Sequence, residues 1–321
     1  MVFPFSSDRV LRDHLSAEQL MRVCDVIWST DRRARAQTSR APIPPGAIVY
    51  AKADHFIPLF HQLRRRRGRV VLVTAESDMA VTVELARTRP LQVAAWFSTN
   101  AVDSSVQPIP LGLANSYCQV ALKAPLLAEH AAPNEKRPRW LYVNFRTESN
   151  PSVRGPIMER FASMGQQDWL TVRHGEAGLE DFVLEMSTHR FIVCPPGNGI
   201  DTHRMWEALY NRTIPIVLRN PALRDFGDLP IIFVEDFREI TLEFLKASYT
   251  RIAGTEWNWE KMFAPWWHKQ LGEARSGLLA RGVRIGRAEF FRRVLTAGWT
   301  TFARRFFASP EREPAAAHSS A

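Results

Sequence analysis

The residues best suited to chemistry lie between positions 194 and 217, which read CPPGNGIDTHRMWEALYNRTIPIV. Gly197 and Gly199 lack a Cβ atom, so a phosphate can approach the backbone closely at this loop. A helix predicted to begin at Asp201 would direct its free N–H groups and its dipole toward the same anion. The stretch therefore predicts a phosphate-binding loop at a helix N-terminus.

The predicted helix carries ionisable side chains just behind the loop. His203, Arg204 and Glu207 are spaced by one, three and four residues, which places them near one face. A cation suits a phosphate and a carboxylate suits a hydroxylated sugar, so we expect a sugar-nucleotide site. A lone helical histidine is more often structural, and His203 is left out of the predicted site. Apolar stretches at 190–194 and 214–218 flank this unit and predict two strands.

This motif resembles the donor-binding segment of exostosin-like glycosyltransferases of the GT-B fold. The matching residues are Pro196, Gly197, Asn198, Gly199, Asp201, Arg204, Trp206, Glu207, Ala208, Ile214, Pro215 and Ile216. The resemblance implies two Rossmann-like α/β domains that face a cleft, with a C-terminal helical segment. It also implies a nucleotide-sugar donor, inverting transfer to a hydroxyl group of a glycan or lipid-linked acceptor, and a role in polysaccharide biosynthesis.

The resemblance also implies roles for the residues of the motif. The Gly197–Gly199 backbone would meet the diphosphate or the sugar, Arg204 would contact phosphate, and Glu207 would accept hydrogen bonds from ribose hydroxyls. The expected donor contacts from the motif are Pro196, Gly197, Asn198, Gly199, Asp201, Arg204 and Glu207. The alternative is a plain crossover turn in which Asp201 caps the helix.

Ligands of open parallel sheets bind beyond the carboxyl ends of the strands. Asn144 and Arg146 stand at the end of a strand predicted at 140–144, and Arg154 follows in a predicted helix at 151–164. Arginine pairs with phosphate in bidentate geometry and stabilises the charge that grows on a leaving diphosphate. We therefore expect these three residues to bind the donor, and the alternative is that both arginines are solvated.

The same rule places two carboxylates beyond the strand predicted at 69–74. An inverting transfer needs a general base for the proton of the attacking hydroxyl group. Glu76 and Asp78 are the catalytic candidates, with Asp54 and His55 in reserve. The alternative for each is a turn or helix-cap residue.

Alternating apolar strands and amphipathic helices predict an α/β fold with parallel sheets in both halves. The first 40 residues are interpreted as mostly helical, with Ile27 on the apolar face. We expect an acceptor domain at 1–135, a polar linker at 131–138, a donor domain at 139–255, an aromatic and basic helical segment at 256–307, and a disordered tail at 308–321.

Composition narrows the class of protein. The chain has 321 residues, no apolar run of about 18 residues and no signal-peptide pattern, so neither a spanning helix nor secretion is expected. Three scattered cysteines predict free thiols in a reducing, cytoplasmic compartment. Neither an Asp-x-Asp motif nor a cluster of metal ligands occurs, so we expect no metal and no cofactor beyond the donor substrate.

The net charge of +9 is concentrated in two places. Arginines occupy positions 64–67 and 69, and eight arginines stand against two glutamates between 271 and 307. Apolar residues recur at helical spacing from Phe291 to Phe306, which predicts a basic amphipathic helix. That helix would lie on an anionic membrane surface or else pack on the protein body. Nucleic acid is not expected, since no binding motif accompanies the charge.

Two other functions compete with glycosyl transfer. A non-catalytic nucleotide-binding or scaffold protein would keep the fold and transfer nothing. A dinucleotide oxidoreductase fits poorly, because Thr202 stands where the third glycine of the fingerprint belongs and Arg219 follows the next strand in place of an acidic residue. A P-loop phosphotransferase is excluded by the absence of a Gly-Lys-Ser/Thr sequence.

Overall fold

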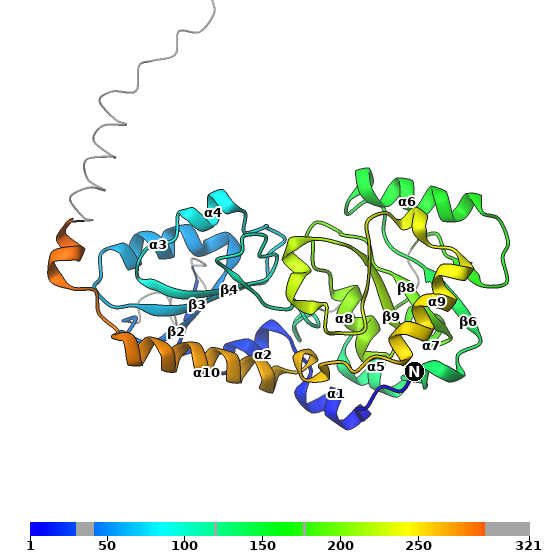
Figure 1. Ribbon diagram of the computed structural model, residues 1–321, viewed down its shortest axis with the longest axis horizontal. Coiled ribbons are helices and arrows are strands. Elements are labelled where there is room, and N and C mark those ends of the chain that lie inside the picture. The colour runs from blue at the N-terminus through cyan, green and yellow to red at the C-terminus, as the bar shows by residue number, and fades with distance from the viewer. Residues whose placement is uncertain (30–41, 119–120, 176–177, 293–321) are drawn as a thin grey trace, which may run out of the picture.

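The computed structural model describes residues 1–29, 42–118, 121–175 and 178–292. These residues form two α/β halves side by side, each built on a five-stranded sheet (Figure 1). All strand pairs within the two described sheets are parallel. The predicted fold class, an α/β protein with two Rossmann-like halves, is therefore confirmed.

The strands of the N-terminal sheet lie in chain order. They are β1 (Val26–Trp28), β2 (Ile48–Lys52), β3 (Val70–Ala75), β4 (Val93–Ser98) and β5 (Gln107–Pro108). Because right-handed crossovers that all step in one direction place their helices on one face, α3 (Phe56–Arg64) and α4 (Val83–Arg87) share a face (Figure 1). The opposite face needs a cover from elsewhere in the chain.

That cover comes from α2 (Ala17–Met21) and α10 (Ala264–Arg281), which contact each other, and α10 also contacts β3. Side chains of β3 alternate accordingly. Val70 and Leu72 belong to the core shared with α3, whereas Val71 and Val73 belong to the core that includes Leu271 and Leu278 of α10. Helix α10 therefore completes the N-terminal half.

The C-terminal sheet has a different order, β10-β9-β8-β6-β7. Its strands are β6 (Arg139–Val143), β7 (Leu170–Val172), β8 (His189–Val193), β9 (Ile214–Leu218) and β10 (Ile232–Val234). The chain first adds β7 on one side of β6 and then adds β8, β9 and β10 on the other side. Such a reversal leaves a crevice at the carboxyl ends of β6 and β8.

Helices cover both faces of this sheet. They are α5 (Ala124–Glu129), α6 (Pro151–Ser163), α7 (Leu179–Ser187), α8 (His203–Tyr210) and α9 (Leu242–Ala253). Contacts of α5 with both α7 and α8 show that these three share a face, and α6 lies on the other side (Figure 1). Short 3-10 turns complete the described elements: η1 (Ala53–His55), η2 (Asn134–Lys136), η3 (Pro221–Phe226), η4 (Phe237–Glu239) and η5 (Trp259–Met262).

The N-terminal segment and the segment around Trp259 cross between the halves. Helix α1 (Ser7–Asp13) contacts α5, and the rings of Phe3 and Phe5 lie 4.9 and 5.8 Å from that of Trp259. From there η5 leads into α10, which runs beneath the N-terminal sheet (Figure 1). The aromatic segment thus docks across both halves, and each half contains residues from far outside the boundaries at 1–135 and 139–255, which stay a prediction.

Two local predictions are wrong. Ile27 lies in β1, where it pairs with Tyr50, and not in a helix. Its neighbours Val26 and Trp28 are buried and Ile27 is exposed, which is the alternation of a strand. The stretch 131–138 is not an exposed linker, because Arg137 is 2% exposed and its guanidinium donates to the carbonyl oxygens of Met186 and His189. The tail at 308–321 and most of the helix predicted from Phe291 to Phe306 lie outside the described residues.

Candidate functional site

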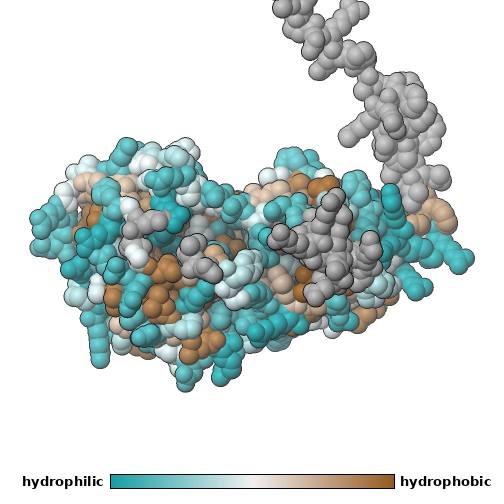
Figure 2. Space-filling view, turned by 180° about the vertical axis from the view of Figure 1, so that it is seen from behind, coloured by the Kyte–Doolittle hydropathy of each residue, from teal (hydrophilic) through white to brown (hydrophobic). Residues whose placement is uncertain are grey.

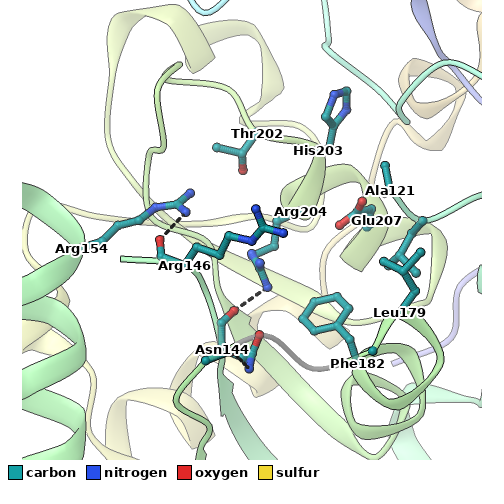
Figure 3. Close-up of a pocket in the computed structure, with 13 residues that line it drawn as sticks. Ala121, Asn144, Arg146, Arg154, Leu179, Phe182, Thr202, His203, Arg204 and Glu207 are labelled. Atoms are coloured by element: carbon teal, nitrogen blue, oxygen red, sulfur yellow. Dashed lines mark hydrogen bonds between the residues drawn. The ribbon is translucent and has the colours of Figure 1, made fainter. Parts of the chain in front are cut away.

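A cavity of about 500 Å³ opens at the carboxyl ends of β6 and β8, and we call it the arginine cavity. Its charged and amide-bearing lining residues are Asn144, Arg146, Arg154, His203, Arg204 and Glu207, with Phe182, Leu179 and Leu122 as apolar neighbours. Figure 3 shows the side chains of Arg154, Arg146 and Arg204 next to one another, with Glu207 and Phe182 beyond them. The reversal of strand order therefore brings three guanidinium groups to one hollow.

Different elements supply these side chains. Asn144 and Arg146 follow β6, Arg154 lies on the first turns of α6, and Arg204 and Glu207 lie one turn apart on α8. The five residues predicted to bind the donor from separate parts of the sequence thus line one cavity.

Arg154 is the most firmly held of the three arginines. It is 7% exposed, its Nε donates to the carbonyl of Pro196 at 3.0 Å, and Nη2 donates to that of Pro195 at 3.1 Å. Nη1 donates to the carbonyl of Arg146 at 2.9 Å and to the hydroxyl of Ser149. Burial lowers the pKa of Arg154 to about 10, which leaves it charged at neutral pH. These partners are neutral, so they fix the guanidinium without cancelling its charge.

Arg204 and Glu207 form the other wall. The guanidinium of Arg204 donates to the carbonyl of Asn144 and lies 4.7 Å from the ring centre of Phe182. Glu207 is 8% exposed, and burial raises the pKa of its carboxyl above the usual range, although Arg204 lowers it. A cation and a buried acceptor thus face the same space, as the helical spacing predicted.

A second cavity, of about 380 Å³, lies between the two halves, and we call it the interdomain cavity. From the N-terminal half it is lined by Lys52, Glu76, Asp78, Asn115 and Tyr117, and from the C-terminal half by Gly197, Asn198, Gly199 and Asp201. Arg154, Thr202 and His203 line both cavities. The glycine loop therefore faces the interdomain cavity, Arg146 and Arg204 face the arginine cavity, and Arg154 lies between the two.

The backbone of the glycine loop is bound by the N-terminal half. The N–H groups of Ile200 and Asp201 donate to Oδ1 of Asn100 at 3.1 and 2.8 Å, and the N–H of Gly197 donates to the carbonyl of Gly199 at 3.0 Å. Asn100 is 2% exposed and has a left-handed backbone with φ of 53°. Protein oxygens therefore already accept from these three N–H groups, so none of the three is free to donate to a phosphate, and the predicted phosphate contact of the Gly197–Gly199 backbone stays a prediction.

Protein side chains also use the space that the two glycines leave. A Cβ at Gly197 would lie 2.8 Å from Nη2 of Arg154, and one at Gly199 would lie 3.1 Å from Nδ2 of Asn100 and 3.2 Å from Oδ1 of Asp78. The close approach predicted from the missing Cβ atoms is therefore real, but the groups that make it come from the protein.

Asp201 ties the halves together. It is 4% exposed, and its two oxygens accept hydrogen bonds from the N–H of Leu111 and from Nε1 of Trp206, both at 2.8 Å. Burial raises the pKa of Asp201 to about 6. Helix α8 begins at His203 with Thr202 as its N-cap residue, so the predicted start at Asp201 is wrong by two residues.

The two predicted catalytic carboxylates differ sharply. Glu76 accepts hydrogen bonds from the hydroxyl of Tyr50 at 2.8 Å, from Nδ2 of Asn115 and from the hydroxyl of Tyr117. Its backbone has a left-handed φ of 56°, which costs free energy in a residue with a side chain. Asp78 is exposed and lies beside Gly199. The reserve residues Asp54 and His55 are not among those that line the two cavities.

Sequence reasoning missed part of the site. Lys52, Asn115 and Tyr117 line the interdomain cavity, and Phe182 lines the arginine cavity. Lys52 ends β2, so the strand-end rule had the signal to find it. Asn115 and Tyr117 lie in a long connection after β5, where no periodic pattern marks them.

The described residues also bear on metal binding, on membrane insertion and on the state of the cysteines. Among the described residues, no group of three or more His, Cys, Asp or Glu side chains is placed to hold a metal ion. Within the same residues, no helix is long and apolar enough to cross a membrane. Cys24, Cys118 and Cys194 are free thiols, as predicted.

The comparison with solved structures found likenesses of low sequence identity. No protein-family model matches the chain, and no curated protein does. A crystal structure of an alpha1,3-fucosyltransferase is 11% identical, covers 71% of this chain and 77% of that chain, and has a TM-score of 0.40. A crystal structure of an alpha1,3-fucosyltransferase with GDP is 14% identical. The match covers 74% of this chain and 79% of that chain, and its TM-score is 0.39. A crystal structure of the GtfA/B complex is 11% identical. The match covers 73% of this chain and 58% of that chain, and its TM-score is 0.34.

Proposed function

We propose that the protein is a glycosyltransferase that moves a sugar from a nucleotide-sugar donor to a hydroxyl group of a glycan or glycoconjugate. One observation carries this proposal: Arg146, Arg154 and Arg204 converge on the strand-order reversal, next to the buried carboxylate of Glu207. Such a site suits a diphosphate with a hydroxylated sugar attached. The exostosin-like motif in the same place supports the same reading.

We propose a role for each residue predicted to contact the donor. Arg146, Arg154 and Arg204 bind the diphosphate, and Glu207 accepts hydrogen bonds from ribose hydroxyls. Asn144 orients Arg204 through its carbonyl. The exposed Asn198, with Gly197 and Gly199, contacts the transferred sugar or the acceptor from the interdomain cavity. Pro196 positions Arg154 by accepting a hydrogen bond from its guanidinium. Asp201 positions Leu111 by accepting a hydrogen bond from its N–H.

The reaction is a direct displacement. An acceptor oxygen forms a bond to the anomeric carbon from the side opposite the diphosphate, the bond from that carbon to the phosphate oxygen breaks, and the configuration inverts. The leaving diphosphate keeps the electron pair and gains charge, which the arginines stabilise electrostatically. A base facing the interdomain cavity takes the hydroxyl proton. We expect protein cations to suffice, so activity in excess chelator equals that without it.

The test is a thermal-shift panel of UDP-, GDP-, CMP- and dTDP-sugars beside NAD and ATP. A ligand at 100 times its Kd stabilises the folded state by about 2.7 kcal/mol. Stabilisation by one nucleotide sugar, followed by release of its nucleotide when acceptors are supplied, supports transfer. Stabilisation without any release of nucleotide favours the non-catalytic alternative, and stabilisation by NAD alone contradicts the proposal.

We also propose a peripheral contact with anionic membrane. The two basic clusters of the sequence meet in space, because the N–H of Arg69 donates to the carbonyl of Val283 and Nε of Arg67 donates to that of Ile285. Positions 64–69 and 281–292 together hold nine arginines and one glutamate. Phe291 is 59% exposed among them. Figure 2 shows strongly hydrophilic and hydrophobic residues together at this end of the molecule.

Vesicles of anionic and of purely zwitterionic lipid test the membrane contact. We expect the full chain to float only with the anionic vesicles, and less so at high salt because exposed charges are screened. The triple variant R281Q/R284Q/R287Q removes three exposed arginines and should lose flotation. Equal flotation of the variant and the parent would contradict the proposal.

A further inference from the structure

The two cavities meet at a small set of residues. Arg154, Thr202 and His203 line both of them. If the donor occupies the arginine cavity and the acceptor the interdomain cavity, the attacked carbon and the attacking oxygen meet at this junction. Among the three, only an imidazole accepts a proton readily near neutral pH, because arginine stays protonated and a threonine hydroxyl is not basic.

A hydrogen bond also fixes the tautomer that the neutral imidazole of His203 adopts. Its Nδ1 lies 2.7 Å from the carbonyl oxygen of Gly112. A carbonyl only accepts hydrogen bonds, so Nδ1 carries the hydrogen and Nε2 carries the lone pair. The carbonyl itself is fixed, because the N–H of Leu113 in the same peptide unit donates to the carbonyl oxygen of Leu15 at 2.8 Å. The N-terminal half thus orients an imidazole that belongs to α8.

The two carboxylates predicted from the sequence compare less well. Glu76 already accepts from three donors, which occupy three of the roughly four lone-pair sites of a carboxylate, and it does not line the arginine cavity. Asp78 lines the interdomain cavity and does not line the arginine cavity. Of the groups that face the interdomain cavity, His203 is therefore the one that reaches the donor side with an unengaged basic atom among the described contacts.

We propose that His203 is the catalytic base, an inference that rests on the proposed glycosyl transfer. As the acceptor oxygen bonds to the anomeric carbon, the hydroxyl proton passes to Nε2 of His203. The bond from carbon to phosphate oxygen breaks, and the nucleoside diphosphate departs with its electron pair. The imidazolium keeps its bond to Gly112 and later returns the proton to water. Asp201, Glu207, Arg154 and Arg204 are the charged groups around it.

The test is the full-length variant His203→Asn. The amide of asparagine can still donate to the carbonyl of Gly112, so the contact between the halves survives while the basic nitrogen is lost. We expect the transfer rate to fall about 100-fold or more, with the thermal shift produced by the donor's nucleoside diphosphate unchanged. The acidic limb of the parent's pH profile of kcat/KM should disappear in the variant.

Two matched variants complete the experiment. His14→Asn makes the same substitution at a histidine whose Nδ1 also binds a carbonyl, that of Val10 at 3.0 Å, away from both cavities; its transfer rate should equal the parent's. Asp78→Asn tests the rival base, and we expect transfer to fall by much less than the 100-fold assigned to a base, because this carboxylate contributes only to the lining of the interdomain cavity. Loss of transfer in Asp78→Asn with retention in His203→Asn would overturn the inference. Absence of transfer by the parent, with every nucleotide sugar, would instead mark failure of the proposed function.

Discussion

The two sheets have the same number of strands and differ in order, and the difference decides where ligands can bind. The C-terminal sheet reverses direction between β6 and β8, and the arginine cavity opens there. The N-terminal sheet runs from β1 to β5 without a reversal, so it has no crevice of this kind. Its carboxyl edge serves instead as one wall of the interdomain cavity, to which the C-terminal half adds the glycine loop.

The two cavities also differ in charge, because the two sheets bring different side chains to them. Three guanidinium groups face the arginine cavity, whereas the N-terminal half contributes Glu76, Asp78 and one lysine, Lys52, to the interdomain cavity. A doubly charged diphosphate fits the first, and a neutral sugar bearing hydroxyl groups fits the second. The comparison predicts that removing charge from the first cavity harms activity more than altering the second.

The largest expected effect follows from Arg204→Gln. Glutamine can still donate to the carbonyl of Asn144, but the charge beside the leaving diphosphate is gone. We expect kcat/KM for the donor to fall by about 100-fold to 1,000-fold, as when one preorganised donor to a transition-state anion is removed. Arg219→Gln is the control, since Arg219 is 60% exposed and paired with Glu235 outside both cavities. If the two variants had equal kinetics, the arginine cavity would have no part in the mechanism.

Asp201→Asn tests the tie between the halves. The amide nitrogen of the asparagine would face either the N–H of Leu111 or the Nε1–H of Trp206. That buried donor then loses its hydrogen bond, which costs about 1–3 kcal/mol of stability. The pKa of Asp201 is raised from 3.8 to about 6 in the folded state. The folded protein then binds the proton more tightly than the unfolded chain, so its stability falls as pH rises from about 4 to 6.

Asparagine does not titrate, and the difference between parent and variant isolates this effect from the other ionisable groups. We expect the parent's advantage in unfolding free energy, measured by urea denaturation, to shrink as pH rises from 4 to 6. Asp225→Asn, at a half-buried side chain that contacts Gln107 across the same interface, is the control for the loss of one carboxylate. An advantage that grows with pH would show that Asp201 is stabilised as the anion.

Glu207→Gln sharpens the comparison within the arginine cavity. Its carboxylate is expected to bind ribose hydroxyls, and a neutral amide accepts such bonds less strongly. We expect the Kd for the nucleoside diphosphate to rise about tenfold, equivalent to about 1.4 kcal/mol. The parent and the variant should bind a diphosphate whose sugar lacks both ribose hydroxyls equally well. A difference that persists with that ligand would assign Glu207 to another part of the donor.

The local elements were predictable and the contacts between them were not. The strand at 214–218 matches β9 residue for residue, and the helix at 151–164 differs from α6 by one residue, because periodicity is a property of neighbours in sequence. The hydrogen bonds from Ile200 and Asp201 to Asn100 join residues about 100 positions apart. No local pattern announces such a pair, and the same holds for the bond from His203 to Gly112. The strand-end rule predicted residues that line two adjacent cavities, and packing between the halves decides which of their groups stay available.

The smallest expected effect comes from the glycine loop itself. A methyl group added by Gly199→Ala would lie 3.1 Å from Nδ2 of Asn100 and 3.2 Å from Oδ1 of Asp78, both on the N-terminal half. We expect the two halves to separate by a few tenths of an ångström, which raises KM for the acceptor a few-fold and costs about 1 kcal/mol of stability. Binding of the nucleoside diphosphate should not change, because the arginine cavity lies on the other side of the loop. Gly227→Ala, where a Cβ would meet nothing within 4 Å, is the matched control. If Gly199→Ala weakened nucleotide binding and left the acceptor KM unchanged, the assignment of the two cavities would have to be exchanged.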